Sequence, residues 1–486
     1  MTKTYLDSAA EAKQKLNAIS PSMCMAKWLQ VSMHLPLGKT QSCYHPPTHN
    51  IPLDELKQNK TALHNTKEKS LQRSMMLKGE RPSGCQYCWN IEDAPNGPHL
   101  SDRHYRSSEE WVGEDGWNEV LEAGANGNIN PRYVEVNFNQ ACNFKCSYCG
   151  PVYSTEWEKE ADEHGPLPLS GKYETWNNLE LLKKQGAMPL SGSSKDNPYV
   201  EAFWEWWPEL YKTLKVFRMT GGEPLMDKNT FRVLEYVNNN PKQDLELSIT
   251  SNMNPPSAKL FDKFMTLVKE IETPRTWHNG QSQHTGSACK HFNLYVSLDT
   301  VGDHAEYLRT GLNYDTLLSN THRFLKESKN SHVNFINTFN IMSIPRLLDF
   351  LKLVMQLRQT YKTDNDSHRV WFDIPYLRLP DWMSIQNIAN YPGIVNYLNI
   401  CVDYMEQNDD CFKDYEVAKL KRNIAWIEQA SSDVSQQQLV QRKKNFYVYF
   451  SALDQRRKTN FTTVFPELSE WWNACKLEEQ CKEVEQ

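Results

Sequence analysis

The chain has 486 residues, a formal net charge of −6 and 12 cysteines. This length exceeds one ordinary core, so we expect two or three domains, and the weakly acidic balance disfavours a nucleic-acid partner. No run approaches the roughly 18 apolar residues of a membrane span, and the first 20 residues lack the apolar core of a signal peptide, so we expect a soluble, cytoplasmic protein with no membrane contact. Cysteines in that reducing compartment favour metal or redox chemistry over disulfides.

Four cysteines lie in the first hundred residues, at Cys24, Cys43, Cys85 and Cys88, the last two spaced as C-x2-C. Four thiolates can surround a zinc ion or ligate an iron–sulfur cluster completely, and the spacing does not distinguish the two. Residues 104–130 are polar and contain Gly- and Asn-rich pieces, which predicts a connecting stretch.

A strand-like run at 134–140 leads into three cysteines spaced C-x3-C-x2-C, which are Cys142, Cys146 and Cys149. A loop this short can direct three thiolates at one inorganic centre. A four-iron cluster normally takes a thiolate at each iron, so three cysteines leave one iron open for chemistry. On spacing alone, a structural metal loop with a distant fourth ligand, or simply free cytosolic thiols, remains the alternative.

Residues 150–208 carry five tryptophans among Gly-, Pro- and Ser-rich pieces, a composition that suits a lid or an extra layer over a site. The strand-like run at 215–220 that follows ends in the turn Gly221-Gly222-Glu223-Pro224. The cysteine motif and this turn, in this order, resemble the radical S-adenosylmethionine (SAM) superfamily.

The resemblance implies that SAM chelates the open iron of a [4Fe-4S] cluster through its amino and carboxylate groups. It also implies that the turn at Gly221, Gly222, Glu223 and Pro224 holds the SAM amino group and that Tyr148 packs near the adenine.

Further strand-like runs at 245–252, 293–299, 332–341 and 370–378 are separated mostly by helix-length segments, which indicates βαβ units and an α/β fold with a parallel sheet. Six such strands match the partial (β/α)6 barrel that the resemblance implies. Most strands alternate polar and apolar residues, so one face would pack under helices and the other would line a polar, ligand-holding lumen.

SAM would lie across the C-terminal ends of these strands, where parallel α/β sheets bind ligands. The resemblance assigns it contacts from the third and fourth strand ends and from the segment after the fourth strand, namely Thr250, Ser251, Asn252, Ser297, Asp299 and Arg309. The guanidinium of Arg309 would face the SAM carboxylate, although without the motif it would be an ordinary surface arginine.

The Gly-, Ser- and His-rich residues 273–290 predict a mobile loop, in which we expect His278, His284 and Cys289 to be solvated and not to bind metal. Near the C-terminus, the spacings of Cys401, Cys411, Cys475 and Cys481 fit no metal pattern, so we expect ordinary thiols there.

The N-terminal cysteines, with Glu92, Ser101 and Arg103 near them, resemble the twitch or SPASM-like auxiliary-cluster module of phage-type radical SAM proteins. Such relatives often have two adjacent cysteines where this chain has Cys43-Tyr44, so a set of four ligands requires Cys24. The resemblance implies an auxiliary [4Fe-4S] cluster, with zinc as the alternative. We therefore expect an auxiliary-cluster module at 1–130, a barrel at 131–385 with insertions at 150–208 and 273–290, and a helical region at 386–486.

The activity that the resemblance implies is reductive cleavage of SAM to a 5′-deoxyadenosyl radical, which abstracts a hydrogen from a substrate. A peptide or protein is the first choice of substrate and a small metabolite the alternative, with flavodoxin or ferredoxin as the kind of electron donor. The rival from another class is a non-catalytic iron–sulfur or zinc scaffold, and a nucleic-acid-modifying enzyme is disfavoured by the acidic balance.

Overall fold

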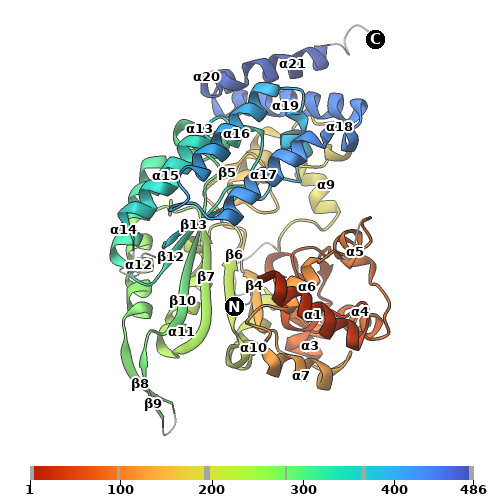
Figure 1. Cartoon of the computed structure of the whole chain (residues 1–486), viewed down its shortest axis with the longest axis vertical. Coiled ribbons are helices and arrows are strands. Elements are labelled where there is room, and N and C mark those ends of the chain that lie inside the picture. Colours follow the sequence, from red (N-terminus) through yellow and green to blue (C-terminus); the bar gives the residue numbers. More distant parts are fainter. Residues whose placement is uncertain (1–4, 96–98, 191–196, 280–281, 363–367, 481–486) are drawn as a thin grey trace. The chain divides into compact units, whose positions relative to one another are not determined.

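The structure is a computed structural model that describes residues 5–95, 99–190, 197–279, 282–362 and 368–480 (Figure 1). Contacts divide the chain into two compact units. The first comprises Met1–Asn139, Pro189–Gly221 and Pro241–Ser248, and the second comprises Gln140–Met188, Gly222–Asn240 and Ile249–Gln486. Both units combine strands with helices, so the protein is of the mixed α/β class.

The first unit contains strands in the order β6-β4-β1-β2-β3. β4 pairs in parallel with β6 and with β1, which places Val134 opposite both Phe217 and Val31, whereas β1–β2 and β2–β3 are antiparallel. The elements of this unit are α1 (Tyr5–Ile19), α2 (Ala26–Leu29), β1 (Gln30–His34), β2 (Lys39–Gln41), β3 (His49–Asn50), α3 (Leu53–Gln58), α4 (Lys67–Leu77), α5 (Gln86–Glu92), α6 (Asp102–Ser107), α7 (Gly113–Ala123), β4 (Tyr133–Asn137), α10 (Pro198–Thr213), β6 (Val216–Thr220) and most of β7 (Lys242–Ser251).

Two expectations for the first unit need correction. Residues 104–130 are not merely a connection, because α6 and α7 occupy most of them; Ser101 caps α6, and α7 buries Val120. The tryptophans at the end of the 150–208 insertion are not a lid. Trp206 and Trp207 are 1% exposed, and α10 packs them into the core with Phe203, whose ring lies 5.0 Å from that of Phe138.

The second unit has β10, β12 and β13 as parallel neighbours, with Leu294 opposite Val333 and Val333 opposite Val370. Its elements are β5 (Lys145–Cys146), α8 (Thr155–His164), α9 (Leu179–Lys184), α11 (Lys228–Asn239), α12 (Ala258–Glu272), β8 (Arg275–Asn279), β9 (Ser282–Gly286), β10 (Cys289–Ser297), α13 (Gly302–Leu308), β11 (Arg309–Thr310), α14 (Tyr314–Glu327), β12 (His332–Ile336), α15 (Leu347–Thr360), β13 (Val370–Asp373), α16 (Pro392–Glu406), α17 (Asp414–Glu428), α18 (Ala430–Asp433), α19 (Gln436–Arg457), α20 (Phe461–Val464) and α21 (Ser469–Gln480).

The predicted alternation is present along these strands. In β10 the apolar residues Leu294 and Val296 are fully buried while Tyr295 and Ser297 are half-buried. β12 and β13 end before the predicted positions, because Asn340 caps a 3₁₀ turn at Ile341–Ser343 and Pro375 cannot donate to a ladder. The six predicted strand runs are all strands, whereas closure into a partial barrel remains a prediction.

Within the predicted loop 273–290, the described residues include two paired strands, β8 and β9. β8 and β9 pair antiparallel as a hairpin that projects from the end of α12 (Figure 1), and the hydroxyls of Thr276 and Thr285 face each other across the strands at 3.1 Å. Cross-strand pairing of this kind stabilises a hairpin whose composition alone suggests a loop.

Helices make up the C-terminal part of the second unit. α19 packs on α21 through the edge-on rings of Phe446 and Trp471 at 5.5 Å, and α20 packs on α21 through the stacked rings of Phe461 and Trp472 at 4.7 Å. Within the described part of the chain, no helix is long and apolar enough to cross a membrane.

Candidate functional site

The three-cysteine loop lies in the second unit and is paired with the segment that carries Arg309. β5 and β11 are antiparallel, with Cys146 opposite Arg309. Arg309 Nη1 donates to Cys146 Sγ at 3.6 Å. Two motifs separated by more than 150 residues therefore share one backbone ladder. Gly311 completes the approach, since a Cβ there would lie 2.7 Å from the carbonyl oxygen of Asn143.

Groups outside the loop hold its backbone. Ser154 Oγ donates to the Phe144 carbonyl at 2.6 Å, and Trp157 Nε1 donates to the Cys146 carbonyl at 2.9 Å. These two residues come from the start of α8, so the first turn of this helix fixes the loop that precedes it.

The C-terminal helix α19 holds the same loop from another direction. Tyr449 Oη donates to the Ser147 carbonyl at 2.7 Å. Arg457 and Lys145 both pair with the buried carboxylate of Glu160, at 3.1 and 2.5 Å. The loop is therefore positioned by residues from both ends of the second unit.

The chemistry of the three thiols fits an iron–sulfur centre. Burial raises the pKa of Cys142, of Cys146 and of Cys149, the last to about 12, and Cys146 raises the pKa of the other two further. As thiolates these three groups would repel one another. Binding to the iron cations of a cluster relieves that repulsion. Among the described residues, no group of three or more His, Cys, Asp or Glu is placed to hold a single metal ion. A four-iron cluster is a different case, because each thiolate binds a different iron.

The Gly-Gly-Glu-Pro turn lies against the start of the cysteine loop. Glu223 N donates to the Ala141 carbonyl at 2.7 Å, and a Cβ on Gly222 would lie 2.3 Å from that same oxygen. Only glycine permits this approach. Gly221 has φ +128°, which again favours glycine, and Pro224 begins a 3₁₀ turn.

The carboxylate of Glu223 ties the turn to the end of β7. It accepts from Ser251 Oγ at 2.8 Å and from the backbone N–H groups of Asn252 and Leu225 at 2.7 and 3.0 Å. Burial raises the pKa of Glu223 to about 7 against these three donors. Asn252 Nδ2 then donates to Asn143 Oδ1 in the cysteine loop at 2.9 Å.

Tyr148, Asp299 and Arg309 form a buried cluster beside Cys146. Tyr148 Oη donates to Asp299 Oδ2 at 2.8 Å, Arg309 Nε lies 2.8 Å from the same oxygen, and Arg309 also donates to the Tyr148 hydroxyl. Burial opposes the charge of Arg309, but Asp299 outweighs it and raises the pKa of the guanidinium. Asp299 is 1% and Arg309 6% exposed, so Arg309 is not a surface arginine.

Other predicted residues are less closely tied. Thr250 and Ser297 are half-buried near the ends of β7 and β10. Sequence reasoning missed Asn254, whose backbone carbonyl accepts from Asn143 Nδ2 at 2.7 Å, and Tyr449. The Asn-rich end of the third strand was a usable signal for Asn254, whereas nothing local marks Tyr449.

The four N-terminal cysteines line one cavity of the first unit. Burial raises the pKa of Cys24, of Cys43 and of Cys88, the last to about 12, and the neighbouring thiols add to the shift at Cys24. A concave, largely apolar wall lined by four thiols suits an iron–sulfur cluster, in which each thiolate binds a different iron. A zinc ion needs all four thiolates around one metal and stays the alternative prediction.

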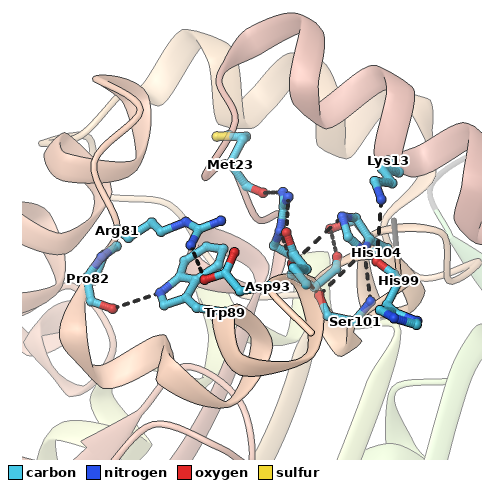
Figure 2. A network of polar contacts seen from close by, with 12 residues as sticks. Lys13, Met23, Arg81, Pro82, Trp89, Asp93, His99, Ser101 and His104 are labelled. Atoms are coloured by element: carbon cyan, nitrogen blue, oxygen red, sulfur yellow. Dashed lines mark hydrogen bonds and ion pairs between the residues drawn. The ribbon is translucent and has the colours of Figure 1, made fainter. Parts of the chain in front are cut away.

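Polar contacts brace the wall of this cavity. Arg103 forms a two-pronged ion pair with Glu92, at 2.6 and 2.8 Å, and donates to the Met23 carbonyl at 2.8 Å. Figure 2 shows this network with Ser101 and His104 on one side and Trp89 on the other, where Trp89 Nε1 donates to the Pro82 carbonyl at 3.1 Å. The three polar residues noted after the C-x2-C motif therefore lie together.

The remaining cysteines are free thiols where they are described. Cys289, Cys401, Cys411 and Cys475 are buried, and Cys481 lies outside the described residues. The expectation that Cys289 is solvated is wrong, because it begins β10 and is buried. The side chains of His278 and His284 lie outside the description, so the expectation for them remains a prediction.

Comparisons with known proteins give distant similarities, and no family model matches the chain. A stretch of 120 residues is 25% identical to a GTP 3′,8-cyclase from Campylobacter lari, which is 25% of this chain and about a quarter, 27%, of that relative. Two crystal structures of Streptococcus suis SuiB, one bound to the precursor peptide SuiA and one to S-adenosylmethionine, align with TM-scores of 0.30 and 0.29. Those alignments have 13% and 12% identity and cover 66% of this chain and 54% and 53% of SuiB. TM-scores this low do not establish a shared fold, and the similarity to GTP 3′,8-cyclase covers about a quarter of either chain.

Proposed function

We propose that this chain is a radical SAM enzyme whose [4Fe-4S] cluster is held by Cys142, Cys146 and Cys149. The observation that carries the proposal is the hydrogen bonding among motifs that are far apart in sequence. The cysteine loop is bonded to the Gly-Gly-Glu-Pro turn through Ala141 and to Arg309 through Cys146. A set of unrelated structural thiols gives no reason for this convergence.

The bound cluster and SAM would supply the chemistry, namely one-electron cleavage of SAM to methionine and a 5′-deoxyadenosyl radical that abstracts a hydrogen from the substrate. The protein's part is to bind and to orient. Glu223 holds the turn on which the SAM amino group would rest, and its buried carboxylate fixes Ser251 and Asn252 at the end of β7. Thr250, Ser297 and Tyr148 complete the proposed SAM contacts.

In this proposal Arg309 has two roles, which are to place positive charge beside the cluster and to bind the SAM carboxylate. Its guanidinium is directed by Asp299 toward Cys146 Sγ, so it places a positive charge beside a cluster thiolate. Five N–H donors leave it able to meet the SAM carboxylate while it keeps the Asp299 pair.

The cavity at Cys24, Cys43, Cys85 and Cys88 would hold an auxiliary [4Fe-4S] cluster in a twitch or SPASM-like module, and structural zinc is the alternative. An auxiliary cluster could accept an electron from a product radical or bind substrate. The external electron donor of the enzyme would be a flavodoxin or a ferredoxin.

For the substrate we favour a peptide or protein, on the strength of the resemblance of the N-terminal cysteines to auxiliary-cluster modules. A small metabolite is the second candidate, and the partial similarity to GTP 3′,8-cyclase favours it. A precursor peptide encoded beside this chain would favour the first, and its absence the second.

The test is 5′-deoxyadenosine formation from SAM by anaerobically reconstituted, dithionite-reduced protein. We expect turnover by the wild type and only background in the variant with Cys142→Ala, Cys146→Ala and Cys149→Ala.

The matched control removes three other thiols of the same unit, through Cys401→Ala, Cys411→Ala and Cys475→Ala, and should retain turnover. If wild type with full iron content forms no more product than the loop variant, with candidate peptides and metabolites present, the chain is a non-catalytic scaffold.

A further inference from the structure

Three cationic side chains are buried behind the four-cysteine cavity. Lys27 of α2 is 2% exposed, and Lys69 and Arg73 of α4 are 0% exposed. Lysine and arginine are almost never buried so completely unless a negative group accompanies them.

Their hydrogen-bond partners are neutral. Lys27 Nζ donates to Gln72 Oε1 at 2.6 Å, and Lys69 Nζ donates to His64 Nδ1 at 2.9 Å. Arg73 donates to the Lys27 carbonyl at 3.3 Å. Burial, followed by the charge of Lys69, holds the pKa of His64 well below its usual range, so this imidazole is uncharged at neutral pH.

Among the described residues, none of the three cations has a carboxylate within ion-pair distance. Other buried arginines have a carboxylate partner, although Arg369 donates to three backbone carbonyls instead. Arg358 in the second unit, also 0% exposed, makes a two-pronged pair with Glu416 at 2.6 and 3.0 Å. Arg103, near the cavity, pairs with Glu92. An uncompensated group of buried cations is therefore a departure that calls for an anion.

The cavity is where that anion can lie. Lys27 lines it together with the four cysteines. Burial raises the pKa of Cys24 and of Cys43 and is the larger effect, whereas the charge of Lys27 lowers the pKa of both. Burial, followed by the charges of Arg73 and Lys27, holds the pKa of Lys69 well below its usual range, and Cys43 acts in the opposite sense.

Other charges on the cavity wall do not supply this compensation. Arg106 also lines the cavity and lies 3.3 Å from Glu109. Asp102 is on the same wall, with its carboxylate 2.5 Å from His45 Nε2. The thiolates are thus the groups with which the buried cations can be neutralised.

We propose that Lys27, Lys69 and Arg73 are the counter-charge of an anionic centre held by Cys24, Cys43, Cys85 and Cys88, and that they raise its reduction potential. The inference rests on the auxiliary cluster of the proposed function. A cluster with four thiolate ligands carries net negative charge, and one-electron reduction adds one more without making or breaking a bond. Fixed positive charge beside the centre therefore favours the reduced state.

The experiment isolates this centre by using the full chain with Cys142→Ala, Cys146→Ala and Cys149→Ala as background. Iron, sulfide and zinc are counted after reconstitution, and the remaining cluster is titrated with dithionite while its electron paramagnetic resonance signal is followed. We expect Lys27→Gln and Lys69→Met to lower the potential. Each should reduce the ratio of reduced to oxidised cluster at a fixed potential about tenfold, which for one electron is about 59 mV.

Lys67→Gln is the matched control, because Lys67 lies on the same helix two residues before Lys69 and is exposed. It should leave the potential unchanged, and Lys27→Arg, which keeps the charge, should stay closer to the background protein than Lys27→Gln. If both charge deletions lose iron while Lys27→Arg and Lys67→Gln retain it, with equal helix content in all four, the counter-charge role is also supported.

Two outcomes separate the inference from the proposal beneath it. An intact cluster with the same potential in Lys27→Gln, Lys69→Met and Lys67→Gln overturns the counter-charge role and leaves the auxiliary cluster standing. Zinc, or no metal, in the background protein itself overturns the auxiliary cluster.

Discussion

Arg309 and Asp299 show how one residue pair can organise the candidate site. Both side chains are nearly inaccessible, and the guanidinium bridges Asp299, Tyr148 and Cys146 Sγ. Removing one charge leaves the other buried and unpaired, which costs roughly 3–5 kcal/mol, whereas removing both avoids that cost.

We therefore expect Arg309→Gln to lower the free energy of unfolding of the second unit by about 3–5 kcal/mol. The double variant Arg309→Gln/Asp299→Asn should recover a large part of this loss. Urea unfolding of the two single variants and the double variant measures the coupling. Additive effects would show that the pair does not act as a unit.

Glu223 predicts a pH dependence with a defined sign. Its pKa is raised from 4.5 to about 7 in the folded state, so between these values the folded chain holds a proton that the unfolded chain releases. The contribution of Glu223 to stability is therefore fully present below pH 4.5, falls as the pH rises from 4.5 to 7, and is lost above 7.

Glutamine at this position does not titrate. The free energy of unfolding of wild type minus that of Glu223→Gln should therefore fall between pH 5 and pH 8. The change should be at most about 3 kcal/mol, since a shift of one pKa unit corresponds to about 1.4 kcal/mol. Thermal unfolding of both proteins across this range measures it. A difference that grows with pH would contradict the assignment.

At the level of single residues, the sequence was most informative where spacing itself determines geometry. Three cysteines within eight residues must lie in one loop, and two glycines followed by Glu223 fit a turn that approaches backbone closely. The spacing could not reveal Tyr449, because a hydroxyl about 300 residues away carries no local pattern.

Helix α19 acts as a support of the cysteine loop, which is a property of an element more than of one residue. Its Tyr449 hydroxyl satisfies the Ser147 carbonyl, and its Arg457 joins the Glu160 carboxylate that also holds Lys145. A buried carbonyl that loses its donor costs about 1–3 kcal/mol.

We expect Tyr449→Phe to fold and to take up iron, but to lose iron from the loop faster to a chelator by about tenfold, since 1.4 kcal/mol is a factor of ten. Tyr447→Phe is the matched control, because Tyr447 lies on the same helix and packs on Trp472. Equal rates of iron loss in the two variants would show that α19 does not hold the loop.

Strands were predictable where polar and apolar residues alternate over the length of a typical strand. The six predicted strands are β4, β6, β7, β10, β12 and β13, and they have four to ten residues each. β1 was not predicted although Gln30–His34 alternates polar and apolar residues. It is buried along almost its whole length, which its three polar residues do not indicate. The β8–β9 hairpin escaped because Ser, Thr and His composition suggests a loop, whereas cross-strand pairing fixes it.

On the scale of the whole molecule, the two compact units are interleaved along the chain. Residues 189–221 belong to the first unit although the second unit has already begun at 140. Composition and motif order cannot reveal such interleaving, because it depends on which aromatic side chains meet in space. The domain boundaries expected at 130 and 385 remain predictions.

The interleaving predicts the behaviour of a fragment. A fragment of residues 140–486 contains every part of the second unit but separates α10 from Phe138 and from β4. It leaves the rings of Phe203, Trp206 and Trp207 without much of their cover, so we expect aggregation on expression.

The same fragment with Phe203→Ser, Trp206→Gln and Trp207→Gln should give a higher soluble yield, which a comparison of soluble fractions would measure. A fragment that is soluble and monomeric without these changes would contradict the prediction.

The hydrogen bond from Tyr449 to Ser147 also sets an order of events during synthesis. At about 5–20 residues per second, the ribosome delivers α19 roughly 15–60 seconds after Cys149. During that interval the three thiols leave the ribosome without the helix that later holds their loop. A cluster can therefore enter a fixed loop only after α19 has been synthesised. During that interval oxygen can reach the unligated thiols.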